Sequence, residues 1–561
     1  MNSRGTALRW AWPAAAALNL LLGLHSYAPP LPLQAGVELV GCTLVGLAHA
    51  HLTRTREDWL SSPCWPAALL MVVPLARTAD GVLGVLSMLA GGLVAAAVVI
   101  RVLEQRFSSR SPHVLAALML GVLALPSRFF VMSQLGVSQV HNRLADQLAL
   151  AWTPTARGTS SQEGPPIVLI TVDALRWDDG STMSSYQRLA ERGRSWPRAM
   201  AGASWTIPSV GTLMTGLLPE EHGAGRIPHG YTTLDPNVST IAQRLSATGW
   251  TTAAIVTNPF LGRALEFDRG FQVWWHPDEL PAQPQLLTGV LGFPHRDANR
   301  VVDHAITWLD GAPDTGFFLW VHLFEPHVPY DNLPSDSELG AVPSREALID
   351  LPVAQRPLAR AAYREEVAHA DRAIHRLLNA LEERGILDEG VVILTADHGE
   401  EFWEHGEVEH GHSHHGEVVD VPLVVVAPGL SPGPQPSVAS LLDVSHTIYA
   451  IAGLTPGPRG HDLRKPLPVN RIAVAAGNLY GADQRSAKDL LQRVILTEKQ
   501  DGPHLEAYDQ LTDPWEQEPR AAPPQSPVAA RAAEVRSVAQ MHQRGAADLN
   551  TEQLEALGYL E

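Results

Sequence analysis

The chain has 561 residues, a formal net charge of −18 and two cysteines, Cys42 and Cys64. Its length exceeds what one hydrophobic core usually supports, so we expect at least two structural units. The first 150 residues contain ten arginines against six acidic residues, so the negative charge lies in the remainder of the chain. This strongly acidic remainder argues against a nucleic-acid partner. The remainder also contains no cysteine, which excludes a disulfide framework there.

The first 140 residues are predicted to form an α-helical transmembrane domain of about five spans. Two of the apolar segments, the first and the fourth, are long enough to cross the hydrocarbon core, which takes about 20 residues. The second and third are shorter and are flanked by charged residues, so four spans are an alternative. A lipid bilayer is therefore an expected partner. The segments cover roughly residues 10–28, 39–52, 63–75, 81–100 and 114–131.

The arginines around these segments predict their orientation. They lie mainly before the first segment, after the second, and between the fourth and fifth, and the positive-inside rule makes these loops cytoplasmic. Arg77 and Arg128 are exceptions to the pattern. The first segment lacks an AxA-like cleavage site, so we do not interpret it as a removable signal peptide. With five spans, we expect an integral protein of a bacterial inner or plasma membrane, with everything after residue 140 on the external, periplasmic side.

The composition changes sharply after the last apolar segment. Residues 141–165 become polar and rich in Gly, Pro and Ser, which is typical of a linker. From residue 166, short β-branched runs such as IVLITV and VVILTA alternate with amphipathic helical stretches. This alternation predicts an α/β catalytic domain, residues 166–528, with a largely parallel sheet covered by helices on both faces. Residues 529–561 are predicted to form a C-terminal helical tail.

Residues 395–416 contain six histidines within eighteen residues, between two apolar runs that we expect to be buried strands. A solvated surface loop is the plain alternative for such a stretch. The adjacent pair Asp397 and His398 is more specific, because a carboxylate and an imidazole at a strand end can bind zinc or manganese together. The six are His398, His405, His410, His412, His414 and His415.

Two further stretches supply candidate partners for this metal. Asp173 follows the first predicted strand of the domain, so it is a candidate third ligand, whereas Asp178 and Asp179 are expected to cap the next helix or turn. Thr206 lies just ahead of a helix that opens with Pro208 and Ser209.

The position of Thr206 allows two interpretations. Free N–H groups and the helix dipole favour an anionic group at a helix N-terminus, and a hydroxyl there beside a metal could act as a nucleophile. Alternatively, Ser204, Thr206 and Ser209 are ordinary N-cap residues. His322 closes the apolar strand FFLWVH and His327 lies between two prolines; each could contact a substrate or second ion, or be structural.

Taken together, the motifs resemble the sulfatase branch of the alkaline phosphatase superfamily over about residues 165–561. The matching stretches run in family order: VDALRWD, SWTIPSVGTLMTGLLPEEHG, FFLWVHLFEPHVPY, ADRAIHRLLNALEERGIL, TADHGEEFWEHG, HGHSHHGEVVDVPLVV, LLDVSHTIYAIAGL, EAYDQLTDPWEQEPRAA and LEALGYLE. The implied fold is an alkaline-phosphatase/sulfatase-like sheet sandwiched by helices.

The resemblance also implies site roles. It implies a metal site formed by Asp173, Asp397 and His398, with Thr206 as both metal ligand and nucleophile. It places His322, His405 and His412 where the family binds the substrate's anionic oxygens or a second metal. His410, His414 and His415 have no secure counterpart, and we expect them to face solvent.

The chain departs from sulfatases at positions that decide the chemistry. Sulfatases carry a cysteine or serine matured to formylglycine, followed by an arginine, where this chain has Thr206 and Val210, and they have a second acid where it has Ala174. Its three lysines, Lys465, Lys488 and Lys499, lie outside the central motifs. Threonine is what phosphoryl-transferring relatives use, among them phosphodiesterases and the phosphoethanolamine and phosphoglycerol transferases of bacterial envelopes. TGLLPEEHG, DPW and LGYLE nevertheless look closer to membrane-anchored sulfatase-like proteins.

The sequence therefore predicts a membrane-anchored, metal-dependent hydrolase or transferase acting on a phosphate ester or phosphodiester, an anionic substrate linked to an envelope lipid or glycan. The expected intermediate is a phosphothreonine, with His322 and His412 assisting. We expect one divalent ion, zinc or manganese, with calcium as an alternative; a second ion would need acids such as Glu400, Glu401 and Glu404. Two alternatives are a sulfuric ester hydrolase and a non-catalytic, metal-stabilised binding ectodomain.

Overall fold

The computed structural model describes residues 163–227, 230–277, 297–331, 342, 344–523 and 525–538. The chain divides into two units, Met1–Gln147 and Leu148–Glu561, and every described residue belongs to the second. The predicted transmembrane domain, nearly all of the predicted linker and most of the predicted C-terminal tail lie outside the described residues. Within the described ranges, no helix combines the length and apolar character needed to cross a membrane.

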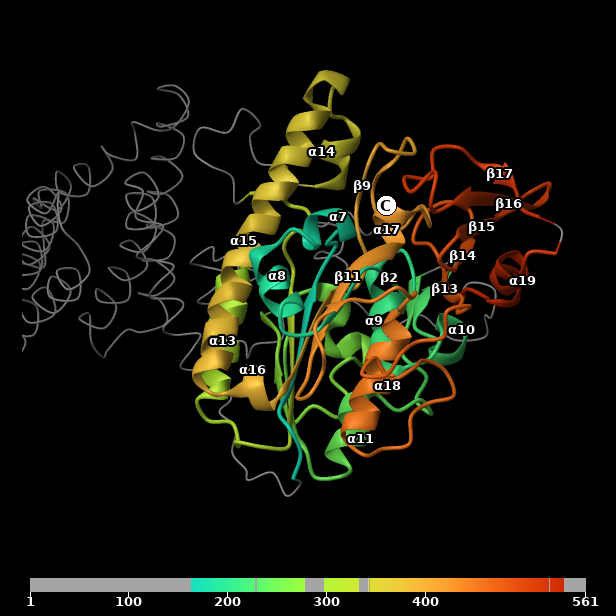
Figure 1. The fold of residues 1–561 in the computed structure, drawn as a ribbon. Helices are drawn as coiled ribbons and strands as arrows, with labels where there is room; N and C mark the ends of the chain where they lie inside the picture. The colour runs from blue at the N-terminus through green and yellow to red at the C-terminus, as the bar shows by residue number, and fades with distance from the viewer. Residues whose placement is uncertain are drawn as a thin grey trace, which may run out of the picture. The chain divides into compact units, whose positions relative to one another are not determined.

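An eight-stranded mixed sheet forms the centre of the described unit (Figure 1). Strand β11 runs antiparallel to both of its neighbours, and the other pairs are parallel. The sheet is therefore largely parallel, as predicted, but not wholly so. In spatial order its strands are β12 (Gly433–Pro434), β2 (Arg194–Met200), β11 (Asp420–Val426), β8 (Val391–Ala396), β1 (Ile167–Val172), β7 (Phe317–Leu323), β5 (Thr251–Ile255) and β6 (Val273–Trp275).

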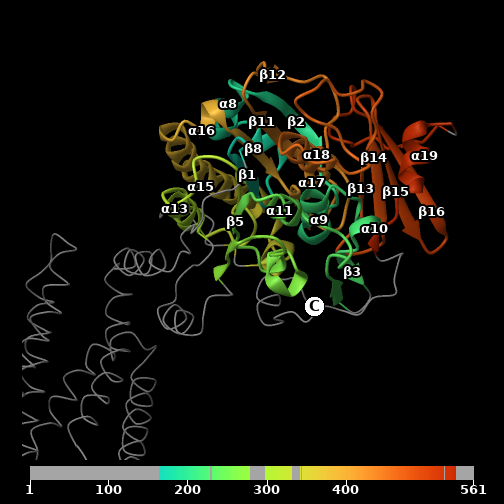
Figure 2. The same cartoon turned by 90° about the horizontal axis from the view of Figure 1, so that it is seen from below.

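Helices cover both faces of this sheet, as the alternating pattern predicted (Figures 1 and 2). One face carries α8 (Ser184–Ala190), α13 (Ala298–Leu309), α15 (Arg356–Glu383) and α16 (Ile386–Glu389). The other carries α9 (Thr206–Thr215), α11 (Ile241–Ser246) and α18 (Leu441–Ile451). Because both faces are covered, strands β1, β7, β8 and β11 are buried along their whole length. This explains why their sequences are continuous apolar runs.

A second sheet of five antiparallel strands follows the central one in sequence and was not predicted. Its strands are β13 (Ala473–Ala476), β14 (Gln484–Lys488), β15 (Gln492–Lys499), β16 (Gly502–Asp509) and β17 (Arg520–Ala521). Helix α19 (Pro527–Glu534) packs on β14 and β15 through Val528 and Ala532 (Figure 2). The helix starts within the predicted catalytic domain, two residues before the predicted tail.

Short elements connect these layers. The histidine-rich stretch lies between β8 and β11, as predicted, and forms a small β9–β10 hairpin followed by one helical turn. The remaining elements are α7 (Trp177–Gly180), α10 (Pro219–His222), β3 (Gly225–Ile227), β4 (Gly230–Thr232), α14 (Arg345–Ile349), β9 (Glu401–Phe402), β10 (Val408–Glu409), α17 (Gly416–Val419) and the 3₁₀ turns Pro259–Leu261, Arg263–Leu265 and Val353–Gln355.

Candidate metal centre and active site

Two adjacent strands end in the carboxylates that were predicted to bind metal. Strands β1 and β8 are parallel, with Val172 opposite Ala396. Asp173 and Asp397 are the next residues, so they leave the same edge of the sheet side by side. Both side chains and that of His398 are fully buried. The sheet thus brings together the three predicted ligands, at the carboxyl ends of its strands, where sites form in α/β proteins.

The polar atoms of these three side chains converge. His398 Nε2 lies 3.5 Å from Asp173 Oδ1 and 3.4 Å from Asp397 Oδ2. Neither of these buried oxygens has a hydrogen-bond partner in the described part of the chain. His398 Nδ1 lies 3.0 Å from Gly399 O. Donation from Nδ1–H to that carbonyl leaves Nε2 unprotonated beside the carboxylates, the arrangement common in metal-binding histidines.

This donor set fits one divalent cation. The three ligand atoms lie within 4.8 Å of one another, and carboxylate oxygens with an imidazole nitrogen suit zinc or manganese. Burial and the neighbouring charge of Asp173 raise the pKa of Asp397. Burial also acts to raise the pKa of Asp173, but His322, His327 and His398 outweigh it and lower that pKa. A cation here would offset the repulsion between the carboxylates.

Thr206 lies beside this group. It is the first residue of α9, which begins two residues before the predicted start at Pro208, and its Oγ1 is 3.2 Å from His398 Nε2. The N-cap interpretation is wrong for this segment, because no side chain caps α9. Ser209 Oγ donates to Asp397 O and accepts from Gly202 N, and Ser204 Oγ donates to Gly477 O. The serines therefore tie loops together, while the Thr206 hydroxyl faces the metal ligands.

Asn258 is a site residue that the sequence interpretation missed. It follows β5, the fourth parallel strand to end at this edge, and its Nδ2 donates to Asp173 Oδ2 and lies 3.4 Å from Thr206 Oγ1. Its Oδ1 accepts from Phe260 N, which fixes the amide orientation. The available signal was a polar residue between the TTAAIV run and Pro259, at the same kind of strand end as Asp173.

His322 lies beside Asp173. It lies near the end of β7 with its ring fully buried, and its Nδ1 is 2.7 Å from Thr171 Oγ1. Trp320 Nε1 donates to the same hydroxyl. On the other side of the ring, His322 Nε2 is 3.4 Å from Asp173 Oδ2. The imidazole is therefore held between a strand hydroxyl and a metal-ligand carboxylate.

Two other histidines approach the centre more closely than the sequence suggested. The ring of His410 lies 4.2 Å from that of His398, and the ring of His327 lies 4.9 Å from that of His410. His410 Nδ1 is 2.9 Å from Glu400 Oε1. Burial, followed by the charges of His398 and His327, holds the pKa of His410 well below its usual value. The expectation that His410 faces solvent is wrong.

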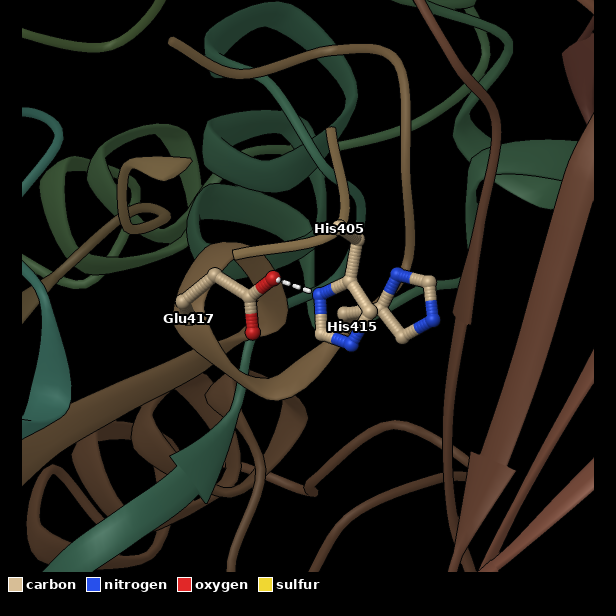
Figure 3. Close-up of side chains that lie close together, drawn as sticks. All are labelled: His405, His415 and Glu417. Carbon is tan, nitrogen blue, oxygen red and sulfur yellow. Dashed lines mark hydrogen bonds and ion pairs between the residues drawn. The ribbon is translucent and has the colours of Figure 1, made fainter. Parts of the chain in front are cut away.

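His405 lies in a different cluster, with His415 and Glu417 (Figure 3). The rings of His405 and His415 are stacked with centroids 3.5 Å apart, and His405 Nδ1 is 2.5 Å from Glu417 Oε1. His405 Nε2 contacts Glu516 O at 2.9 Å. These contacts tie the histidine-rich stretch to the segment after β16. Among the described residues, His405 therefore forms no hydrogen bond with Asp173, Asp397 or His398.

The remaining predicted groups also find partners of their own. His412 Nε2 is 2.9 Å from Glu401 Oε2, so His412 is not bonded to the metal ligands either. His414 is fully buried, with Nδ1 3.1 Å from Ser486 Oγ of the second sheet, and His415 is half-buried, so neither faces solvent freely.

The acids proposed for a second ion are likewise paired. Glu400 contacts His410, Glu401 contacts His412, and Glu404 forms a 2.8 Å ion pair with Arg176. The prediction that Asp178 and Asp179 are caps is wrong: they lie in the first turn of α7 and pair with arginines. Their partners are Arg176, Arg360 and Arg364.

The fold and the strand-end side chains together define an α/β domain with a candidate metal centre at the carboxyl edge of its central sheet. The sulfatase family model matches residues 165–454, more than half of the chain. The chain therefore belongs to the sulfatase family, whose members are metal-dependent.

Curated relatives carry sulfatase names. Arylsulfatase K of Xenopus laevis is 37% identical over 101 residues, 17% of this chain and 18% of that protein. Human arylsulfatase A is 25% identical over 355 residues, 53% of this chain and 66% of that protein. The match to the arylsulfatase K proteins spans about a fifth of their length.

Solved structures share the fold. The phosphonate monoester hydrolase of Agrobacterium radiobacter aligns with a TM-score of 0.51 and 20% identity over 66% of this chain and 93% of that chain. A putative sulfatase from Bacteroides thetaiotaomicron aligns with a TM-score of 0.51 and 18% identity over 66% of this chain and 90% of that chain. These likenesses establish the common architecture.

Proposed function

We propose that this protein is a metal-dependent hydrolase or transferase that cleaves a phosphate ester or phosphodiester through a covalent phosphothreonine at Thr206. The proposal rests mainly on one observation, the position of Thr206 Oγ1 at the start of α9 and 3.2 Å from His398 Nε2. A hydroxyl there lies among the side chains that can hold a cation, and beside backbone N–H groups that favour a phosphoryl group.

The chain's own residues account for each step. Asp173, Asp397 and His398 would hold the ion, which when bound would supply positive charge that favours the ionised hydroxyl and the transition state. Thr206 Oγ is buried, so it loses its proton to water that enters with the substrate, and it forms a bond to phosphorus while the bond to the leaving oxygen breaks. That oxygen takes a proton from His322. Water, or an acceptor hydroxyl in a transferase, then gives a proton back to His322 and attacks phosphorus, and Thr206 Oγ leaves as the alkoxide that begins the next cycle.

Neighbouring groups position these atoms. Asn258 contacts both Asp173 and Thr206, so it orients the nucleophile relative to the ligands. His412 Nε2 lies 2.9 Å from Glu401 Oε2. We propose that His412 contacts the substrate's non-bridging oxygens when substrate is bound. His405 was assigned a similar role from the resemblance, and its contacts with Glu417 and Glu516 favour a supporting position instead.

A sulfuric ester hydrolase is the second candidate, favoured by the names of the curated relatives. Two observations favour the phosphoryl reaction. Threonine at position 206 cannot be matured to formylglycine as a cysteine or serine is. Lys488 is buried against Asp420 at 2.6 Å and Lys465 lies 3.7 Å from Asp462, so neither lysine is among the groups that contact the Asp173 centre.

The substrate comparison tests this proposal. The full chain, purified in detergent, is assayed with p-nitrophenyl phosphate, bis-p-nitrophenyl phosphate and p-nitrophenyl sulfate, alongside Thr206→Ala. We expect at least one phosphorus ester to be cleaved faster than the sulfate, and the variant to lose several orders of magnitude in rate. Cleavage of the sulfate alone, or full activity in Thr206→Ala, would contradict the proposal. Bound metal without any esterase activity would instead support a binding ectodomain.

We further propose that residues 1–140 anchor the catalytic domain in a bacterial inner or plasma membrane, facing the periplasm, where lipid- or glycan-linked phosphoesters are the expected substrates. The support is the set of apolar segments and their flanking arginines. Cells converted to spheroplasts provide the test. External protease should digest the domain after residue 165 while the chain stays with the membrane fraction. Full protection from protease, or release by carbonate washing, would contradict this placement.

A further inference from the structure

A second group of metal-ligating side chains lies outside the Asp173 centre. Asp297, Glu325 and His369 each offer one ligand atom, and these atoms lie within 4.8 Å of one another. They come from three elements far apart in sequence: Asp297 is the N-cap of α13, Glu325 follows β7, and His369 lies on α15. The tertiary fold therefore assembles this group.

One carboxylate oxygen in the group is buried without a partner. Asp297 Oδ1 caps α13 by accepting from Asn299 N at 2.9 Å, and Oδ2 is 3.1 Å from His369 Nε2. Glu325 Oε1 accepts from Ala298 N at 2.8 Å, whereas Oε2 meets no hydrogen-bond donor among the described residues. Glu325 is only 5% exposed. An ionised oxygen in such a place is costly unless a cation or proton compensates it.

The surrounding charges strengthen this requirement. No described arginine or lysine forms an ion pair with Asp297 or Glu325, and the side chain that approaches Asp297 most closely in this group is the imidazole of His369. Two more carboxyl groups interact with this group through their charges, Glu366 with Glu325 and Asp331 with Asp297, and Asp331 N donates to Glu366 Oε1 at 2.7 Å. Burial and then the charge of Asp297 raise the pKa of both Glu325 and Asp331. The group thus concentrates negative charge around one imidazole.

We propose that Asp297, Glu325 and His369 bind a second divalent cation, of the zinc or manganese class. Two carboxylates and an imidazole form the donor set that such ions take, and they leave coordination positions for water. The ion would connect the start of α13, the end of β7 and α15. It would also fix the loop from Glu325 to His327, whose imidazole contacts His410 of the main centre. We therefore assign it a structural role.

Metal stoichiometry tests the proposal. The full chain without a histidine tag is loaded separately with Zn²⁺ and Mn²⁺, passed over a desalting column and analysed by mass spectrometry of the elements. We expect two equivalents of one of these ions in the wild type and one in Glu325→Gln and in His369→Ala. Asp397→Asn should lose the other equivalent, so failure of the main centre and of this site are distinguishable. Asp303→Asn, which changes an α13 carboxylate paired with Arg376, is the matched control and should keep two.

Thermal unfolding provides a second measurement for variants that fold poorly with metal absent. In the Asp397→Asn background, adding the same ion should raise Tm by about 2–4 °C or more, because an ion that binds only the folded chain stabilises it. The rise should disappear when Glu325→Gln is added. One equivalent in the wild type and none in Asp397→Asn would overturn the proposal, as would an equal rise in Tm with and without Glu325→Gln.

Discussion

Asn258 illustrates how single residues set the geometry of the centre. Its amide donates to a metal-ligand carboxylate and lies within reach of the proposed nucleophile. We expect Asn258→Ala to lower kcat by about 10–100-fold and to weaken metal affinity by a similar factor, as loss of outer contacts to metal ligands usually does. Steady-state kinetics and a chelator competition measure the two effects. Asn379→Ala, a change on the surface of α15, should alter neither.

The contact between His405 and Glu417 predicts a pH dependence of stability. Burial acts to lower the pKa of His405, but Glu417 outweighs it and raises that pKa to about 9. A histidine with a raised pKa contributes stability that is complete below about pH 6.5 and is lost as the pH rises through about 9. Glu417→Gln should therefore lower Tm near pH 7 by roughly 2–4 °C, since we expect the pair of a partly buried His405 and a buried Glu417 to contribute about 1 kcal/mol.

Thermal unfolding of wild type and Glu417→Gln between pH 6.5 and pH 10 measures this effect. The two Tm values should converge above about pH 9. A difference in Tm that stays constant across this range would mean that packing, and not the ion pair, accounts for the loss.

At the scale of elements, the loop after β8 depends on a close approach of two backbones. Gly399 N donates to Val418 O at 2.7 Å, and a Cβ at Gly399 would lie 2.1 Å from Glu417 O, inside contact distance. Gly399→Ala must therefore separate the loop from α17. Because Gly399 directly follows the metal ligands, we expect the variant to lose about 1–3 kcal/mol of stability and to bind metal more weakly. Gly457→Ala, where a Cβ would lie 3.8 Å from its nearest neighbour, Gly216 O, should cost less.

The elements also reveal what could be predicted from the sequence. Asp173 and Asp397 were found because each directly follows an apolar run long enough to be a buried strand, and parallel neighbours end at one edge. The direction of β11 could not be predicted, because a buried run such as LVVVA is the same in a parallel or an antiparallel strand. The second sheet has partly exposed strands such as β16, whose burial pattern gives little periodicity.

The site was only partly predictable for a related reason. Asp397 and His398 are adjacent in sequence, so their shared role was visible there. Asn258, His327 and His410 reach the centre through loops, and their positions depend on contacts between residues far apart in the chain. Sequence spacing within residues 395–416 could not show which of the six histidines reach the centre. The structure shows that the ring of His410 contacts that of His398, whereas His405 lies in a different cluster.

At the scale of the whole described unit, buried ion pairs connect the two sheets. Asp420, at the start of β11, is fully buried and lies 2.6 Å from both Lys488 Nζ of β14 and Arg493 Nη2 of β15. Burial lowers the pKa of Lys488 to about 7, even with Asp420 beside it. Asp420→Asn would remove the negative charge from two buried cations. We expect a loss of about 3–5 kcal/mol in the free energy of unfolding.

Denaturant unfolding of the full chain in detergent measures the effect of Asp420→Asn. Asp509→Asn, at a partly exposed position of β16 whose carboxylate lies 3.8 Å from Arg520, is the comparison and should cost much less than Asp420→Asn. Equal losses in the two variants would show that the buried pairs do not hold the sheets together.

The central claim is that Thr206 becomes covalently phosphorylated during turnover. The most direct measurement is acid quenching of the metal-loaded enzyme with a phosphate ester, followed by high-resolution peptide mass spectrometry that separates a phosphoryl from a sulfuryl group. We predict a phosphoryl group on Thr206 in the wild type and none in Thr206→Ala. Two results would contradict the account. One is an unmodified Thr206 in enzyme that is turning over under conditions where hydrolysis of the intermediate is rate-limiting. The other is a sulfuryl group on Thr206 that forms only from a sulfate ester.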